Sequence, residues 1–387
     1  MKLTPASTIT DLNRAHYVQL DGLRGLAILL VMIYHFALPH AGFHASNGGW
    51  VLQLAEAGWM GVDLFFVLSG FLITGILLET RRNDHYFRNF LARRFLRIWP
   101  LYYLSLLALI VVLPLVLPSV PAELRSMQAK QGWFWMYGAN WLFARENGFG
   151  QTSGGYFWSL AVEEQFYLAW PLVVYWLSER ALLRTSLTLL GLSLALRIAL
   201  AYAGTDSNAL YTMTFTHLDG LALGSALSVA MRTPQLKARV SRIMPVAGCL
   251  AIPALVAIRI ADGNLLFWSH YMATFGYTVI VIIFGALLVY LLSGGAVFRA
   301  DRLFSSKFMT QCGKYSYALY MVHVPVASLL FPLLLQSLAR VRPVVGYELV
   351  YLICVAVSFA VSWALAFASW HLLEKRILSL KRYFTYG

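Results

Sequence analysis

The sequence predicts an all-α integral membrane protein with about ten transmembrane helices and both termini in the cytoplasm. Of its 387 residues, 59% are hydrophobic and 12% are charged, against roughly 45–50% and 25% in soluble proteins. The apolar residues are also gathered into runs of about 17–25 residues, the length that crosses the roughly 30 Å hydrocarbon layer as a helix. A soluble fold of this composition would expose large apolar patches to water.

Ten apolar runs follow one another, and each is interpreted as one span. The first, LDGLRGLAILLVMIYHF, follows a polar N-terminus unlike a cleavable signal peptide and should remain as a helix. The second, GVDLFFVLSGFLIT, is separated from the third by an Arg-rich segment, and the fourth contains WSLAVEEQFYLAWP. Short polar segments with basic residues, Gly or Pro separate the later runs. The expected spans are at about 23–39, 59–79, 98–117, 157–177, 186–203, 213–231, 243–260, 271–292, 315–335 and 347–370.

The basic residues indicate the orientation of these spans. With the N-terminus inside, 21 of the 26 Lys and Arg that fall in connections lie on the cytoplasmic side, as the positive-inside rule requires. The net charge of +13 is thereby explained by topology, and the expected partner is the lipid bilayer and not a nucleic acid. Cys249, Cys312 and Cys354 are far apart, so neither a disulfide framework nor a metal site is expected.

No linker or low-complexity tract divides the chain, so residues 1–387 are predicted to form a single transmembrane domain. Ionisable residues inside the spans are candidates for function because they are costly to place in a membrane. Arg24 and His35 are eleven residues apart, which places them on one helix face, about 16 Å apart in depth. A free histidine titrates near neutrality, so His35 could be a general base, with a buried structural residue as the alternative. Arg24 could bind an anionic ligand or anchor the helix end.

Two carboxylates in the next spans are also candidates. Asp63 begins the second span near the depth of His35; it could orient the imidazole or cap the helix. Glu163 forms a polar stripe with Ser159 and Tyr167 at i, i+4 and i+8 of the fourth span. This stripe could line a channel, with a structural ion pair as the alternative.

Basic and aromatic residues complete the candidate set. Six Arg lie between residues 81 and 97; Arg94 and Arg97 are assigned to an anionic cofactor and the others to topology. His323 follows several tyrosines and could line the path of this cofactor or be a buried core residue. Asp219 has the same two interpretations, and His371 at the inner end of the last span could contact the donor or cap the helix.

These patterns resemble acyltransferase family 3, a family of membrane O-acyltransferases. The resemblance begins with an Arg, ten intervening residues and a His, followed by GVDLFFVLSGFLI. It continues through RRFLRIWPLYY at 93–103, WSLAVEEQFYLAWP at 158–171, LDGLALG at 218–224, GKYSYALYMVHVPV at 313–326 and WHLLEKRIL at 370–378. It covers nearly the whole chain.

The resemblance implies a ten-helix protein that uses cytoplasmic acyl-CoA, often acetyl-CoA, to modify a polysaccharide, peptidoglycan or another acceptor. It implies essential roles for Arg24 and His35. It carries the family's Arg-x-x-Arg pair onto Arg94 and Arg97, and its FFVLSG segment onto a stretch that includes Ser69.

Two departures from the family pattern stand out. Many relatives have an additional extracytoplasmic hydrolase-like domain, and this chain stops soon after Glu374. The expectation is therefore that no such domain is fused, and that transfer is direct or uses a separate periplasmic partner protein. His217 stands where relatives often have Arg ahead of LDGLALG.

The sequence thus predicts an O-acyltransferase of the bacterial inner membrane. It would move an acyl group, with acetyl first in line, from acyl-CoA to a hydroxyl of a carbohydrate or other envelope acceptor, with His35 as general base. The alternative is a proton-coupled transporter or exporter. In that alternative the intramembrane ionisable residues form a relay: Arg24, His35, Asp63, Glu163, Asp219 and His323.

Overall fold

A computed structural model describes residues 18–37, 55–149, 154–294 and 300–385. These residues form helices and turns, with no strand among them. The principal helices are α2 (Val18–Ala37), α4 (Gly61–Thr80), α5 (Tyr86–Leu107), α10 (Phe157–Trp176), α11 (Glu179–Tyr202), α13 (Asp219–Ala230), α14 (Pro234–Asp262), α15 (Tyr277–Leu292), α17 (Lys307–Pro325), α18 (Phe331–Ser337) and α20 (Tyr347–Ser369). Shorter helices are α6 (Leu113–Val116), α7 (Ala122–Ala129), α8 (Gln131–Trp135), α9 (Ala139–Arg145), α12 (Ser207–Thr212), α16 (Ala300–Phe304), α19 (Arg342–Val345) and α21 (Lys375–Ser379).

Eight helical stretches of the described residues are long and apolar enough to cross a membrane. In three of them a π-helical turn joins two α-helices: η2 (Ala108–Val112) joins α5 to α6, η6 (Val326–Leu330) joins α17 to α18, and η7 (Trp370–Glu374) joins α20 to α21. The last stretch continues through the 3-10 turn η8 (Leu380–Tyr383). The all-α membrane fold is therefore confirmed, while Lys2, Arg14 and Arg299, counted for the orientation, lie outside the described residues.

The other two expected spans are helices of a different kind. The run at 157–177 is α10, whose 20 residues include two Glu and a largely buried face. The run at 213–231 is only partly helical: α13 has 12 residues, or about 18 Å, which is too short to cross the hydrocarbon layer. All residues of α13 are buried. In its irregular approach, the 3-10 turn η3 (Thr214–Thr216), Thr214 and Thr216 are also buried, whereas Phe215 is exposed. A membrane tolerates non-helical backbone where protein surrounds it.

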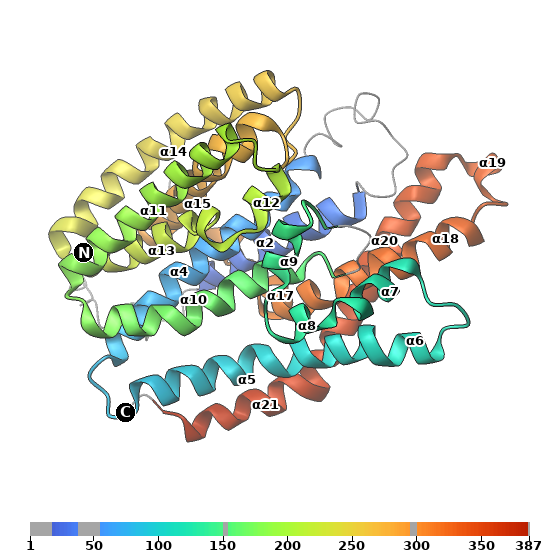
Figure 1. Ribbon diagram of the computed structural model, residues 1–387, viewed down its shortest axis with the longest axis horizontal. Coiled ribbons are helices and arrows are strands. Elements are labelled where there is room, and N and C mark those ends of the chain that lie inside the picture. Colours follow the sequence, from blue (N-terminus) through green and yellow to red (C-terminus); the bar gives the residue numbers. More distant parts are fainter. Residues whose placement is uncertain (1–17, 38–54, 150–153, 295–299, 386–387) are drawn as a thin grey trace, which may run out of the picture.

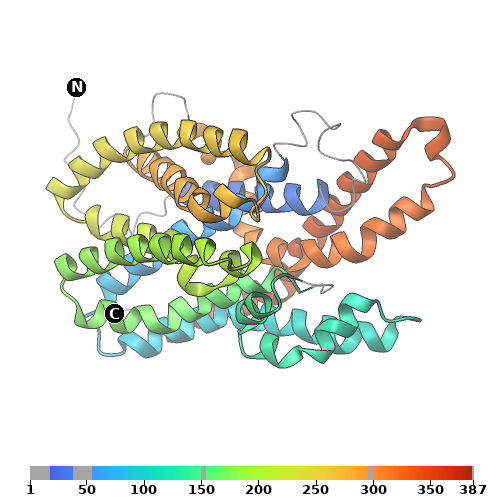
Figure 2. The same ribbon diagram turned by 45° about the horizontal axis from the view of Figure 1, so that its top comes forward.

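The helices pack in a compact group around α2, α4 and α17 (Figure 1). On one side α11, α14 and α15 form a layer, and α5 and α21 lie along the opposite side. α4 and α13 cross closely, because a Cβ at Gly70 would overlap the backbone oxygen of Leu221 and a Cβ at Gly224 would overlap that of Val67. Figure 2 shows α18 and α20 side by side, projecting from the remainder of the molecule.

A buried ion pair joins α11, α13 and α15. Arg197 Nη2 lies 3.0 Å from Asp219 Oδ2, and both side chains are fully buried. The guanidinium also donates to the carbonyl oxygens of Thr216 and Thr274, at 2.6 and 3.0 Å, and to Thr278 Oγ1 at 2.5 Å. Arg197 and Thr278 thus both donate to Oδ2 of Asp219, the contacts expected of a buried core residue.

Candidate active site

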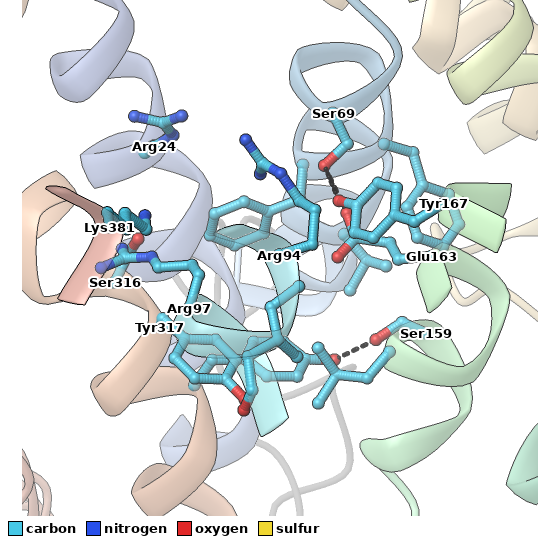
Figure 3. Close-up of a pocket in the computed structure, with 16 residues that line it drawn as sticks. Arg24, Ser69, Arg94, Arg97, Ser159, Glu163, Tyr167, Ser316, Tyr317 and Lys381 are labelled. Atoms are coloured by element: carbon cyan, nitrogen blue, oxygen red, sulfur yellow. Dashed lines mark hydrogen bonds between the residues drawn. The ribbon is translucent and has the colours of Figure 1, made fainter. Parts of the chain in front are cut away.

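A cavity of about 290 Å³ lies between α2, α4, α5, α10 and α17, with η8 at one side (Figure 3). Seven of the residues singled out from the sequence line it, although they come from four helices: Arg24, Ser69, Arg94, Arg97, Ser159, Glu163 and Tyr167. The wall also contains Val62, Phe65, Phe66, Ile98, Leu160, Ser316, Tyr317, Tyr320 and Lys381. The helical packing therefore brings the predicted residues of α2, α4, α5 and α10 to one place.

Cationic side chains line one part of the cavity. Arg24 donates from Nη1 to Asp21 Oδ1 at 2.8 Å, and Arg97 Nη1 lies 3.8 Å from Glu374 Oε2. Arg94 Nε is buried and has no hydrogen-bond partner among the described residues. Lys381 reaches the same cavity from η8. Four cations with two paired carboxylates favour an anionic ligand, and guanidinium groups suit phosphate oxygens in particular.

Hydroxyl groups and a carboxylate line another part of the cavity. Tyr167 donates to Ser69 Oγ at 3.0 Å, and Ser69 donates to Glu163 Oε1 at 2.5 Å. Ser159 Oγ lies 2.5 Å from the hydroxyl of Tyr320. The predicted stripe of Ser159, Glu163 and Tyr167 therefore does face a cavity, and the chain of hydroxyls ends on the Glu163 carboxylate (Figure 3).

His35 and His323 lie together, away from the cavity wall. Their ring centroids are 4.8 Å apart, and the ring of Tyr320, which lines the cavity, is 5.4 Å from that of His323. His35 Nδ1 is 2.9 Å from the Val31 carbonyl oxygen, and His323 Nδ1 is 2.7 Å from that of Tyr320. Because a carbonyl oxygen can only accept, each Nδ1 carries a hydrogen and each neutral imidazole presents an unprotonated Nε2.

Asp63 does not form the expected pair with His35. Its Oδ1 instead lies 2.9 Å from His217 Nε2, and both side chains are fully buried. The reason is the orientation of α4 about its own axis. Asp63 and Gly70 are seven residues apart on one face of α4, and that face is turned toward α13. His217, just ahead of α13, therefore meets Asp63, which gives this histidine a partner that the sequence had left open.

A second cavity, of about 740 Å³, adjoins the first. Its wall is mostly apolar and is formed by α5, α10 and the residues after α21: Leu91, Ala92, Arg94, Phe95, Leu96, Trp99, Glu164, Tyr167, Leu168, Leu380, Tyr383 and Phe384. We call it the apolar groove. Arg94 and Tyr167 line both cavities. Glu164 accepts from Trp99 Nε1 at 3.0 Å, and its Oε1 is buried with no partner among the described residues.

The remaining arginines of the segment 81–97 have other roles. Arg81 donates to the carbonyl oxygens of Val174 and Leu177 at the end of α10. Arg82 and Arg88 are exposed. His371 is exposed, and its Nδ1 lies 2.9 Å from the Phe367 carbonyl oxygen, so the structure places it outside the cavity.

Lys381 was missed as a site residue. From sequence it is one of many cytoplasmic-side cations, and no spacing links it to Arg94 and Arg97, which precede it by more than 280 residues.

Within the described part of the chain, no group of three or more His, Cys, Asp or Glu could hold a metal ion.

Comparison with known proteins identifies the family. The family model for acyltransferase family 3, described as an acyltransferase domain, matches residues 17–367. The chain is 31% identical over 344 residues to the peptidoglycan O-acetyltransferase OatA of Listeria monocytogenes, covering 84% of this chain and 51% of the relative. It is 30% identical to the putative peptidoglycan O-acetyltransferase YrhL of Bacillus subtilis, covering 92% and 54%.

The O-acetyltransferase OatA of Staphylococcus aureus is 29% identical, with 79% of this chain and 50% of the relative covered. The chain thus spans about half the length of the curated relatives it matches. No solved structure matches. The family model covers most of the chain, including every residue of the cavity wall except Lys381, and the protein belongs to acyltransferase family 3.

Proposed function

We propose that the protein is an O-acyltransferase of the bacterial inner membrane that transfers an acetyl group from cytoplasmic acetyl-CoA to a hydroxyl of a cell-envelope carbohydrate. The observation that carries this proposal is the cavity, which brings together cations suited to phosphates and the Ser69–Glu163 pair. The relatives named as peptidoglycan O-acetyltransferases support a peptidoglycan sugar as the acceptor.

The donor would enter with its phosphates against Arg94 and Arg97. A cavity of about 290 Å³ is at the small end of ligand pockets, so it suits the narrow pantetheine arm rather than the whole nucleotide. The thioester would then point toward Tyr320, beyond which His323 and His35 lie. Acyl-CoA is a co-substrate in this proposal, and the residues present fit its anionic groups.

His35 serves as the general base. Its Nδ1 hydrogen bond to Val31 leaves Nε2 free to accept a proton, which is the tautomer that a base requires. Nε2 takes the proton of the acceptor hydroxyl as the oxygen attacks the thioester carbonyl. The C–S bond then breaks, the CoA thiolate leaves, and the proton on His35 is returned to the thiolate or to solvent.

The transporter alternative receives less support. It requires a relay that includes Asp63 and Asp219, whereas within the described residues these carboxylates are bonded to His217 and Arg197 on the far face of α4. Arg24 and Glu163 lie in the cavity, and His35 and His323 form a third group. The six residues therefore fall into three groups and not into one chain.

The test is acetyl transfer by the purified protein in lipid vesicles. Acetyl-CoA labelled in the acetyl group is supplied with peptidoglycan fragments, and thiol release and labelled sugar are both followed. We expect stoichiometric thiol and O-acetyl formation. A transporter would instead release no thiol.

The variant His35→Ala should lower turnover by about 10²–10⁴-fold, the usual contribution of general-base catalysis, with CoA binding unchanged because His35 does not line the cation-rich wall. The matched control is His270→Ala, since His270 is exposed and does not line the cavity. If His35→Ala keeps more than a few per cent of wild-type turnover, the base is another residue, with His323 the first to test.

A further inference from the structure

The last described turn of the chain contributes a cation to the cavity. Lys381 lies on η8, which continues directly from α21, and its side chain lines the same wall as Arg94 and Arg97 (Figure 3). The family model ends at residue 367. Lys381 is therefore a feature of this chain that the family assignment does not explain.

The helix that supplies the arginines also holds the backbone around Lys381. Arg93 Nη1 donates to the carbonyl oxygens of Lys381 and Phe384, at 3.3 and 3.0 Å. Asn89 Nδ2 donates to the carbonyl oxygen of Thr385 at 2.6 Å. Three backbone carbonyls are thus bonded to α5, so the backbone that carries Lys381 is held beside the cavity before any ligand arrives.

Carboxylates compensate only part of the positive charge around Lys381. Arg24 is paired with Asp21, and Arg97 lies beside Glu374. Neither Lys381 nor Arg94 forms an ion pair within the described residues, and Arg94 Nε has no hydrogen-bond partner there. Cations that repel one another at a poorly solvated wall favour an anion that bridges them, and a phosphate offers several acceptor oxygens.

We propose that Lys381 binds a phosphate group of the CoA donor, and that residues 375–385 form part of the donor site through their attachment to Arg93 and Asn89. This inference rests on the proposed function, because the donor itself is proposed there. Lys381 would act together with Arg94 and Arg97, and its ammonium would contact either the pyrophosphate or the 3′-phosphate.

The experiment measures the dissociation constant of CoA for the purified full chain by isothermal titration in lipid nanodiscs. Lys381→Met should weaken CoA binding by about 10–100-fold, the effect of losing a charge-assisted hydrogen bond. Lys375→Met is the matched control: it removes the same charge from the same segment, but Lys375 is exposed and does not line the cavity. It should change affinity less than twofold.

Three further arms sharpen the result. Pantetheine, which lacks phosphates, should bind wild type and Lys381→Met equally. Dephospho-CoA distinguishes the two phosphates: a Lys381→Met effect that disappears with this ligand assigns the 3′-phosphate, and one that persists assigns the pyrophosphate. Arg93→Gln should weaken CoA binding although Arg93 does not line the cavity, because it releases the segment, and Lys381→Arg should retain binding.

Two results would overturn the inference and leave the proposed function intact. In the first, the wild type binds CoA and Lys381→Met binds it with the same affinity. In the second, Lys381→Met and Lys375→Met lose affinity for CoA equally, which would indicate a general charge effect. Failure of the wild-type protein to bind CoA would overturn the donor assignment and this inference with it. An unchanged thermal unfolding midpoint excludes misfolding of Lys381→Met as the cause of weaker binding.

Discussion

His35 and His323 are held in the same tautomer by the same kind of local hydrogen bond. Each Nδ1 donates to a carbonyl oxygen three or four residues earlier in its own helix, which needs no partner from elsewhere in the chain. Two imidazoles with centroids 4.8 Å apart cannot both become cations without strong repulsion. The pair is therefore suited to holding one proton at a time, as a single base requires.

At the cation-rich wall, Arg94→Met and Arg97→Met should each raise KM for acyl-CoA by about 10–100-fold through loss of a charge-assisted hydrogen bond. Turnover at saturating donor should stay near wild type, because a contact made equally in ground and transition states chiefly affects KM. Met retains the aliphatic stem and so preserves packing. Initial-rate kinetics against acetyl-CoA measure both constants.

The matched control for this pair is Arg82→Met, since Arg82 belongs to the same arginine-rich segment but is exposed. Its KM should match wild type. An unchanged KM in both Arg94→Met and Arg97→Met would return these residues to a purely topological role.

The residues of the cavity differ in how far sequence could predict them. Arg24, Arg94, Arg97 and Glu163 stand in motifs whose spacing fixes a helix face, and all four line the cavity. The pairing of Asp63 with His35 was wrong, because equal depth in the membrane says nothing about rotation around the helix axis. Gly70, on the same face as Asp63, could have indicated this rotation, since a neighbouring helix closely approaches a helix face with small residues.

Among the elements, the crossing of α4 and α13 depends on the absence of side chains. Gly70→Ala should destabilise the fold by about 1–3 kcal/mol, the usual cost of overpacking, because the new Cβ would overlap the backbone of Leu221. Unfolding in mixed micelles, followed by circular dichroism, measures the change.

Gly191→Ala provides the comparison. Gly191 lies within α11, and a Cβ there would meet nothing within 4 Å, so its substitution should be neutral or stabilise the helix by up to about 1 kcal/mol. Equal effects of the two substitutions would mean that α4 and α13 can move apart without loss of stability.

Element boundaries were predictable where hydropathy alone decides them. The runs that became α2, α4 and α15 agree with the expected spans within several residues. The boundaries of the helix in the run at 213–231 were not predictable from hydropathy. α13 is buried among α4, α11 and α15, and an apolar segment surrounded by protein has the same composition as one surrounded by lipid. Partners distant in sequence, such as Arg197 with Asp219, likewise require knowledge of the packing.

For the whole molecule, the distribution of basic residues predicts which face meets the cytoplasm. In a variant without Cys249, Cys312 and Cys354, Asp84→Cys lies in the turn between α4 and α5, and Ala122→Cys begins α7; both positions are exposed. An impermeant maleimide applied to intact cells should label Ala122→Cys only. Asp84→Cys should react only after the membrane is permeabilised, because its turn belongs to the arginine-rich side.

Labelling of Asp84→Cys from outside, with Ala122→Cys protected, would reverse the orientation and move the cation-rich wall away from the cytoplasmic donor. Phe90, within the same segment, is fully buried, so a cysteine there would report burial and not sidedness.

The side chains shared by the cavity and the apolar groove also form a boundary between a polar and an apolar space. Among the described residues, Arg94 and Tyr167 belong to both linings. These two side chains therefore lie between the polar cavity and a groove bordered by the exposed apolar residues Leu91, Phe95 and Leu168. The stem of Arg94 can face the apolar side while its guanidinium faces the polar side. Truncation of either side chain should therefore connect the two cavities, so Arg94 forms part of a boundary as well as part of the cation-rich wall.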